Sequence, residues 1–147
     1  MGLWTLLRVG LLLLAAVQAL LGLWALSAPR AFYDGFPFPG HAWVALLPPY
    51  NEHLVRDVGG LSLALTVVLG AAALTLDRTM IRVALLALAV FAIPHTVFHA
   101  GHLAGFPADD ALAQTVGTVL HLVVTACLFA LTWRLPAKAP PKRTPPA

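Results

Sequence analysis

The stretch LWTLLRVGLLLLAAVQALLGLWALS, residues 3–27, decides the class of fold. It is a continuous apolar run in which Arg8 is the only charged side chain. A helix that crosses the hydrocarbon core of a bilayer needs about 20 apolar residues in a row. The run is long enough, and it ends before Ala28 and Pro29 because proline makes further helix costly. The stretch therefore predicts a first transmembrane helix.

Three more apolar runs follow, at residues 51–76, 80–104 and 110–134. In the 147-residue chain 60% of residues are hydrophobic and 10% are charged, whereas soluble domains have about 25% charged residues. This composition excludes a cytosolic enzyme, a disordered chain and a nucleic-acid-binding module. We predict an all-α fold with the lipid bilayer as its main partner. One polytopic membrane domain, residues 1–134, forms a four-helix bundle with a long outer loop between the first two helices.

Local signals mark the ends of these runs. Asn51 is expected to cap the second helix and Asp109 or Asp110 the fourth, because a short polar side chain accepts hydrogen bonds from the first free N–H groups. Pro94 lies inside the third run, where it predicts a kink of a kind that membrane helices tolerate.

Two further patterns bear on packing. Small residues, at Gly59-Gly60 in the second run and at Gly101 and Gly105 near the end of the third, predict close approach of helices. The outer loop, residues 28–50, is rich in aromatic side chains and proline and is expected to anchor at the membrane interface. Within it, residues 41–47 are an alternative candidate for a lid over a polar site.

The basic residues divide unequally between the two sides of the predicted bundle. Seven fall on one side, namely Arg8, Arg78, Arg82, Arg134, Lys138, Lys142 and Arg143. Only Arg30 and Arg56 fall on the other. By the positive-inside rule both termini are predicted to be cytoplasmic. Residues 135–147 are expected to be a disordered, basic, Pro-rich cytoplasmic tail. The bias toward Ala, Leu, Arg and Pro indicates a high-GC bacterium and hence a bacterial plasma membrane.

Polar side chains recur on one face of three runs. They are Glu52, His53, Arg56 and Asp57 in the second, His95, His99 and His102 in the third, and Gln114, Thr118, His121 and Thr125 in the fourth. Ionisable groups inside a span are costly and mark functional sites by default. With a rise of about 1.5 Å per residue, His95 and His121 both lie about 20 Å from the cytoplasmic helix ends, and Asp57 and His99 about 28 Å. We therefore predict a polar column in the outward-facing half of the bundle.

The chemistry of this column favours a membrane redox protein that binds a metal or haem. Neutral imidazole binds copper, zinc and iron. The metal-ligand candidates are His53, His95, His99, His102 and His121. His95 and His121, at one level, are also the cofactor-binding candidates, as the two axial ligands of a haem b. The catalytic candidates are Asp57, Glu52 and Arg56, and Asp57 or Gln114 would orient the imidazoles.

Several alternatives stay open from the sequence. The histidines could simply hydrogen-bond across the bundle, and Glu52 with Arg56 could be a local i, i+4 ion pair at the interface. A second functional class is a cofactor-free enzyme or carrier for a lipid-like molecule such as a quinone or isoprenoid, with Asp57 and a histidine exchanging protons. A third is a non-catalytic accessory subunit, in a homo-oligomer or beside a membrane redox partner.

The arrangement of residues 3–134 resembles that of the small bacterial DoxX-like integral membrane proteins. The shared features are a hydrophobic first helix, a long outer loop rich in proline and aromatic residues, and a second helix that starts polar and soon reaches Gly59-Gly60. Because some members of that group are associated with quinone-linked sulfur oxidation, the resemblance implies a membrane redox role. The histidine row is not part of the shared pattern, so the resemblance assigns no site residues.

The start of the chain also resembles a secretory signal peptide, with Arg8, an apolar stretch and a small-residue cleavage pattern at residues 17–19. Because the apolar run continues to Trp24, we expect an uncleaved first helix. Intact-mass measurement and N-terminal sequencing of protein purified from membranes are expected to give the uncut chain. A mature N-terminus at Leu20 would contradict this expectation.

Overall fold

A computed structural model describes residues 2–47 and 49–135, and the regular structure within them is helical. The elements are α1 (Leu3–Ser27), α2 (Pro29–Gly35), α3 (Glu52–Thr75), α4 (Arg78–Gly101), α5 (Ala108–Leu131) and the short 3₁₀ helix η1 (Thr132–Arg134). Four segments, α1, α3, α4 and α5 with η1, are long and apolar enough to cross a membrane. The prediction of an all-α, four-helix membrane bundle is confirmed. The side on which the termini lie stays a prediction, and the predicted basic tail beyond Leu135 lies outside the described residues.

Two helix starts are capped by polar side chains, one of which the sequence analysis expected. Asn51 Oδ1 accepts a hydrogen bond from Leu54 N at 3.2 Å, as expected for the cap of α3. Asp77 Oδ1 caps α4 by accepting from the backbone N–H groups of Thr79 and Met80 at 3.0 and 2.9 Å. Both carboxamide and carboxylate thus satisfy N–H groups that have no partner inside the helix.

The expected cap of the fourth helix is wrong. The N-cap of α5 is Pro107, and Asp109 and Asp110 lie in the first turn without capping it. The Asp110 carboxylate instead bonds to side chains of the outer loop. At the other end of the α4–α5 connection, α4 runs through Pro94 and stops at Gly101, before the expected end of the third span.

The outer loop contains a helix that the sequence analysis did not predict. Pro29 ends α1 and also occupies the first turn of α2, where its missing N–H and fixed φ are acceptable. The rings of this region pack on one another: Phe32 lies 5.5 Å from Trp24, and Phe36 lies 6.0 Å from Trp43, between centroids. The aromatic residues therefore form a packed cluster over the end of α1.

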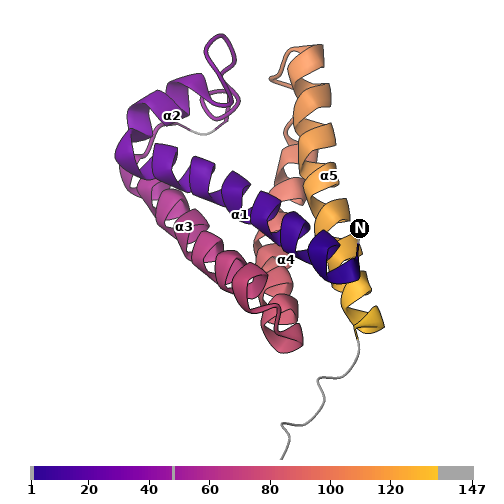
Figure 1. Ribbon diagram of the computed structural model, residues 1–147. Coiled ribbons are helices and arrows are strands. Elements are labelled where there is room, and N and C mark those ends of the chain that lie inside the picture. Colours follow the sequence, from indigo (N-terminus) through magenta and orange to yellow (C-terminus); the bar gives the residue numbers. More distant parts are fainter. Residues whose placement is uncertain (1, 48, 136–147) are drawn as a thin grey trace, which may run out of the picture.

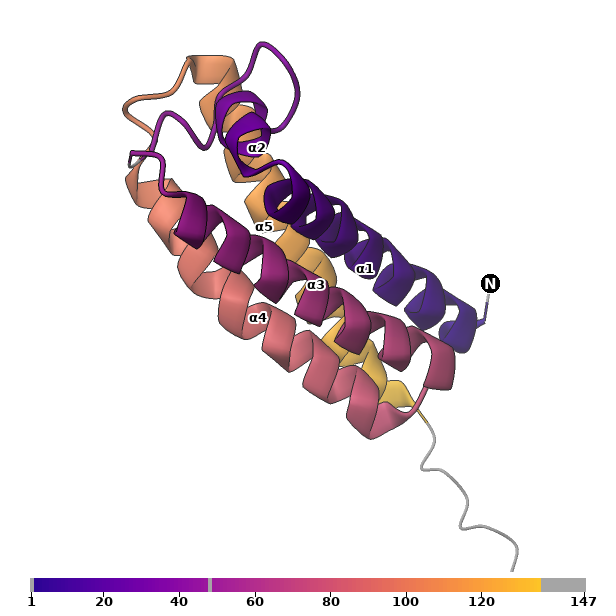
Figure 2. The ribbon, with the colours of Figure 1, turned by 90° about the vertical axis from the view of Figure 1, so that its left-hand side faces the viewer.

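The long helices form two antiparallel pairs (Figures 1 and 2). α1 packs along α3, and α4 packs along α5, while α3 and α4 are joined by a tight turn and also pack together. We call the end with Leu3, the α3–α4 turn and Leu135 the base, and the end with α2 and residues 102–107 the loop end. In Figure 1 the two pairs lie closest near the base and diverge toward the loop end.

The buried side chains change from apolar to polar along the bundle. The apolar core lies in the half nearer the base, with Leu7, Leu11, Leu69, Ile81 and Leu85 almost completely buried. The buried polar residues of the half nearer the loop end are Gln18, Ser62, Asp110 and Gln114. The bundle therefore holds its polar side chains where its apolar core ends.

Helices α1 and α3 make backbone contact at two glycines. A Cβ atom on Gly22 would lie 2.9 Å from Gly59 O, and one on Gly59 would lie 2.8 Å from Leu26 N. The close approach predicted at Gly59 is thus present, with Gly22 as its partner. The one expected at Gly101 is wrong, because a Cβ there would meet nothing within 4 Å.

This contact gives a matched pair of substitutions. Gly59→Ala is expected to destabilise the protein by about 1–3 kcal/mol, because the new methyl group overlaps backbone atoms that cannot rotate away. Gly60→Ala, whose methyl group would meet nothing within 4 Å, is expected to be neutral or stabilising by up to about 1 kcal/mol. Thermal unfolding in one mild detergent compares the two variants. Equal melting temperatures would contradict a backbone contact at Gly59.

Candidate functional site

The three histidines of α4 divide into two environments. His95 and His99 lie together, with ring centroids 4.4 Å apart. His95 is exposed at the surface of the helix and stacks on Phe91, while His99 is half-buried. His102 turns away, because its Nδ1–H donates to Phe98 O at 2.7 Å and its ring stacks on Phe98. Only His95 and His99 therefore share one place.

A hydrogen bond near the base fixes how α4 and α5 align. Arg82 Nε donates to Thr132 Oγ1 at 2.9 Å. The two helices are antiparallel, so residues at equal sequence separations from this contact lie at the same level. His99 is therefore level with Thr115, and His95 is level with residue 119. Gln114 and His121 are thus neighbours of His99 and His95: the Gln114 amide lies within hydrogen-bonding range of the His99 ring, and the His121 ring interacts electrostatically with the His95 ring.

These four side chains form what we call the imidazole–amide site: His95, His99, Gln114 and His121. Gln114 is only 2% exposed, and although its amide faces His99, neither its Oε1 nor its Nε2 has a partner with good hydrogen-bond geometry. The same holds for His99 Nδ1 and His121 Nε2. In native proteins nearly all buried polar atoms are hydrogen-bonded, so a cluster of unpartnered ones calls for an explanation.

Gln18 of α1 was missed by the sequence analysis as a polar interior residue. It is 1% exposed, and its Oε1 also has no partner. The signal was present in the sequence, since an amide within an apolar span is costly and marks an interior position.

The predicted polar stripe of α3 is not part of this site. Arg56 bonds to Glu52 Oε1 at 2.9 Å and to Leu26 O at 2.5 Å, and His53 Nε2 lies 3.3 Å from Asp57 Oδ2. All four side chains are exposed. Asp57 is thus exposed and beside His53, so the structure does not bring it into an interior column with His99, and the local ion pair of Glu52 with Arg56 is the arrangement found. Spacing along α3 defines a common face, but it does not define which way that face points.

The predicted set of five metal ligands is not assembled. Among residues 2–47 and 49–135 no group of three or more His, Cys, Asp and Glu side chains is placed to hold a metal ion. His53 pairs with Asp57 on the surface of α3, and His102 stacks on Phe98. The donor set present therefore does not fit a multi-ligand Cu, Zn or Fe centre. His95 and His121, the candidate axial ligands of a haem, remain on neighbouring helices.

The outer loop is tied to α5 by one carboxylate. Asp110 Oδ1 accepts from Trp43 Nε1 at 2.8 Å and from the Nδ1–H of His41 at 2.6 Å. The Asp110 side chain is mostly buried, whereas the His41 side chain is 35% exposed. Residues 41–47 are thereby held over the α4–α5 connection. Beneath them is a cavity of about 410 Å³ lined by Leu46, Leu47, Gly101, His102, Ala104 and Gly105.

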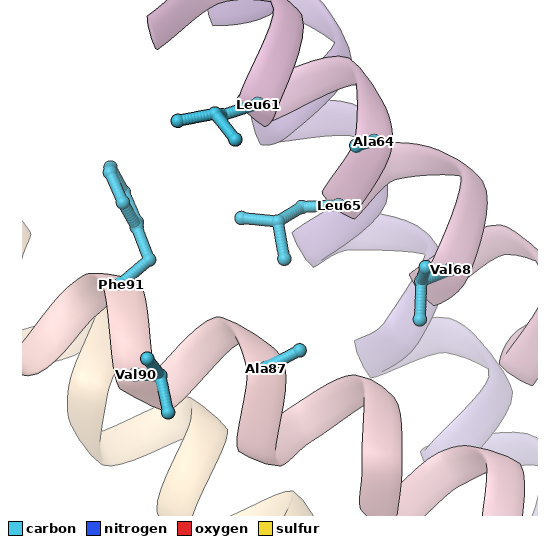
Figure 3. Close-up of a pocket in the computed structure, with 7 residues that line it drawn as sticks. All are labelled: Leu61, Ala64, Leu65, Val68, Ala87, Val90 and Phe91. Carbon is cyan, nitrogen blue, oxygen red and sulfur yellow. The ribbon is translucent and has the colours of Figure 1, made fainter.

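An apolar groove leads along the surface to the imidazole–amide site (Figure 3). It has a volume of about 260 Å³ and runs between α3 and α4. Its lining residues are Leu61, Ala64, Leu65 and Val68 of α3 and Ala87, Val90 and Phe91 of α4. Phe91 stands at its loop end, and the ring stacks on His95 with centroids 5.2 Å apart. The groove therefore ends where the imidazoles begin.

Comparisons with protein-family models, with curated proteins and with solved structures found no match. The resemblance to DoxX-like proteins stays an expectation from the sequence.

The hydrogen bonds that Asp110 accepts from the outer loop can be tested by substitution, with the exposed Asp109 as the control. Asp110→Ala removes the acceptor of both His41 and Trp43, and hydrogen bonds to a charged group contribute about 1.5–3 kcal/mol each. We expect residues 41–47 to become much more sensitive to limited proteolysis in detergent. Asp109→Ala is the control, because Asp109 is exposed. Similar cleavage rates in the two variants would show that the carboxylate does not hold the loop.

Proposed function

We propose that the protein binds a membrane-dissolved amphiphile with an apolar tail and a hydrogen-bonding head group, of the quinone or isoprenoid-alcohol class, at the imidazole–amide site. The observation that carries the proposal is the cluster of buried polar atoms on His99, Gln114 and His121 that have no partner with good hydrogen-bond geometry. It lies in a segment of the bundle that is apolar enough to be surrounded by lipid.

The cost of leaving these atoms unpartnered supports a bound ligand. A buried donor or acceptor without a partner costs about 1–3 kcal/mol. A neutral imidazole has one N–H donor and one acceptor nitrogen, and a carboxamide has both kinds of group. A head group with carbonyl or hydroxyl oxygens meets both demands: a quinone carbonyl accepts, and a quinol hydroxyl donates and accepts.

The surroundings of the site support an apolar tail. The head group would reach His99 and Gln114 past His95, which is exposed at the helix surface. The tail would lie in the groove between α3 and α4, whose lining is made of aliphatic side chains and Phe91. Small-molecule sites combine an apolar lining with a few polar groups in this way.

The side chains also suit proton exchange with such a head group. Histidine is the side chain whose unperturbed pKa lies nearest to neutral pH, so an imidazole can give and take a proton there. The distribution of basic residues supports cytoplasmic termini. In that orientation the imidazole–amide site lies in the outward-facing half.

A haem held by His95 and His121 is the second candidate function. The two residues lie at one level on neighbouring helices, and His121 Nε2 has no partner. Two axial histidines are an established way of holding haem iron. When bound, a haem would supply one-electron transfer, and the two imidazoles would fix its position between α4 and α5.

Direct binding of a short-chain quinone tests the proposal. Protein in nanodiscs is titrated with decylubiquinone, and binding is followed by quenching of tryptophan fluorescence. Gln114→Leu removes an amide with two unpartnered atoms at nearly constant volume, so Kd is expected to rise about tenfold, the equivalent of about 1.4 kcal/mol. His53→Leu is the matched control, because His53 is exposed on α3 and remote from the groove.

The outcomes separate the two candidates. Equal Kd values for wild type, Gln114→Leu and His53→Leu would overturn quinone binding at this site. A visible absorption spectrum and metal analysis of the same preparation test the haem. A haem band that disappears in both His95→Ala and His121→Ala, together with no quinone binding, would replace the first proposal with the second.

A further inference from the structure

A pair of arginines at the base is not used by the imidazole–amide site. Arg78 and Arg82 stand four residues apart near the start of α4, so they lie on one face of the helix and about one turn apart. Arg8 and Arg134 belong to the same end of the bundle. Five of the six acidic residues of the chain belong to α2 or to the loop ends of α3 and α5, and Asp77 alone is at the base.

Asp77 does not neutralise this pair. Its carboxylate accepts hydrogen bonds from two backbone N–H groups of the first turn of α4. Among the described residues, none of the ion pairs includes Arg78 or Arg82. The base therefore has an uncompensated positive charge at the level where a spanning helix leaves the hydrocarbon core.

Arg82 is held in a fixed position. Its Nε donates to Thr132 Oγ1 at 2.9 Å, and its guanidinium group lies over the Trp133 ring, 4.2 Å from the centroid. Thr132 is 0% exposed, and its hydroxyl donates in turn to Phe129 O at 2.7 Å. The arginine is thus oriented before any ligand arrives, which lowers the entropic cost of binding.

Both guanidinium groups have buried nitrogens without a partner, Arg78 Nε and Arg82 Nη2. A planar guanidinium has donors in a fork that matches the oxygens of a phosphate. Charge, donor geometry and unpartnered nitrogens all call for one kind of ligand, an anion with several oxygens.

We propose that Arg78 and Arg82 form a binding site for the phosphate of an anionic lipid head group, such as that of phosphatidylglycerol. The lipid is favoured as the source of the phosphate because the apolar residues that follow on α4, Val83 and Leu86, are exposed and would accommodate its acyl chains. Trp133 is exposed beside Arg82 and suits the interface between head groups and hydrocarbon. The site is at the opposite end of the bundle from the imidazole–amide site and does not depend on the function proposed there.

Native mass spectrometry of the full chain, released from a mild detergent, tests the site. Phosphatidylglycerol and phosphatidylcholine with the same acyl chains are titrated separately, and inorganic phosphate forms a third arm. Wild type is expected to retain phosphatidylglycerol at least tenfold more tightly than phosphatidylcholine. Arg78→Gln is expected to weaken phosphatidylglycerol binding about tenfold, the equivalent of about 1.4 kcal/mol. Arg82→Gln is expected to do the same.

The control is Arg30→Gln, because Arg30 lies at the loop end and is paired with Asp34 at 2.7 Å. Arg82→Gln also removes the bond to Thr132, so Arg78→Gln keeps the test independent of any loss of stability. Equal retention of the two lipids by wild type would overturn the proposal, as would unchanged binding in Arg78→Gln. Saturable binding of inorganic phosphate that displaces the lipid at micromolar concentration would overturn the lipid as the ligand.

Discussion

At Gly22 and Gly59 the backbones of α1 and α3 lie so close that neither position has room for a methyl group. This contact lets the two helices pack along most of their length, and it brings the end of α1 within reach of Arg56, which bonds to Leu26 O. α2 and the aromatic cluster are then supported by the packed ends of α1 and α3. Because α3 packs mainly against α1, α4 and α5 form the second pair. The polar groups between α4 and α5 are therefore separate from the contact between α1 and α3.

The two halves of the interior differ in what stabilises them. Near the base, leucine and alanine side chains fill the space between the helices, as in the core of a soluble protein. Toward the loop end, buried amide and imidazole groups replace them, and several of their atoms have no protein partner. Aliphatic side chains there would have made a more stable bundle, since unpartnered polar atoms are costly. Their presence where stability does not require them is the physical reason to regard that half as functional.

The sequence predicted the long helices well, but it predicted poorly which way their polar faces point. Four apolar runs gave four helices, and Asn51 caps its helix as expected because capping is a local interaction. α2 was missed because Pro29 both ends one helix and begins another. The stripe around Asp57 has the spacing of an interior face but lies on the surface, since periodicity cannot state which neighbour a face meets. The bond between His41 and Asp110 joins residues 69 positions apart, a distance at which no local pattern carries information.

The link between the outer loop and Asp110 also has a mechanical consequence. The loop extends from the pair formed by α1 and α3, whereas Asp110 belongs to the pair formed by α4 and α5. At the base the pairs are joined by packed side chains and a short turn, so a relative motion would pivot there and be largest at the other end. Two hydrogen bonds of 2.6 and 2.8 Å to one carboxylate oxygen then act as a tether. Separation of the two pairs at the loop end would therefore have to break both hydrogen bonds to Asp110.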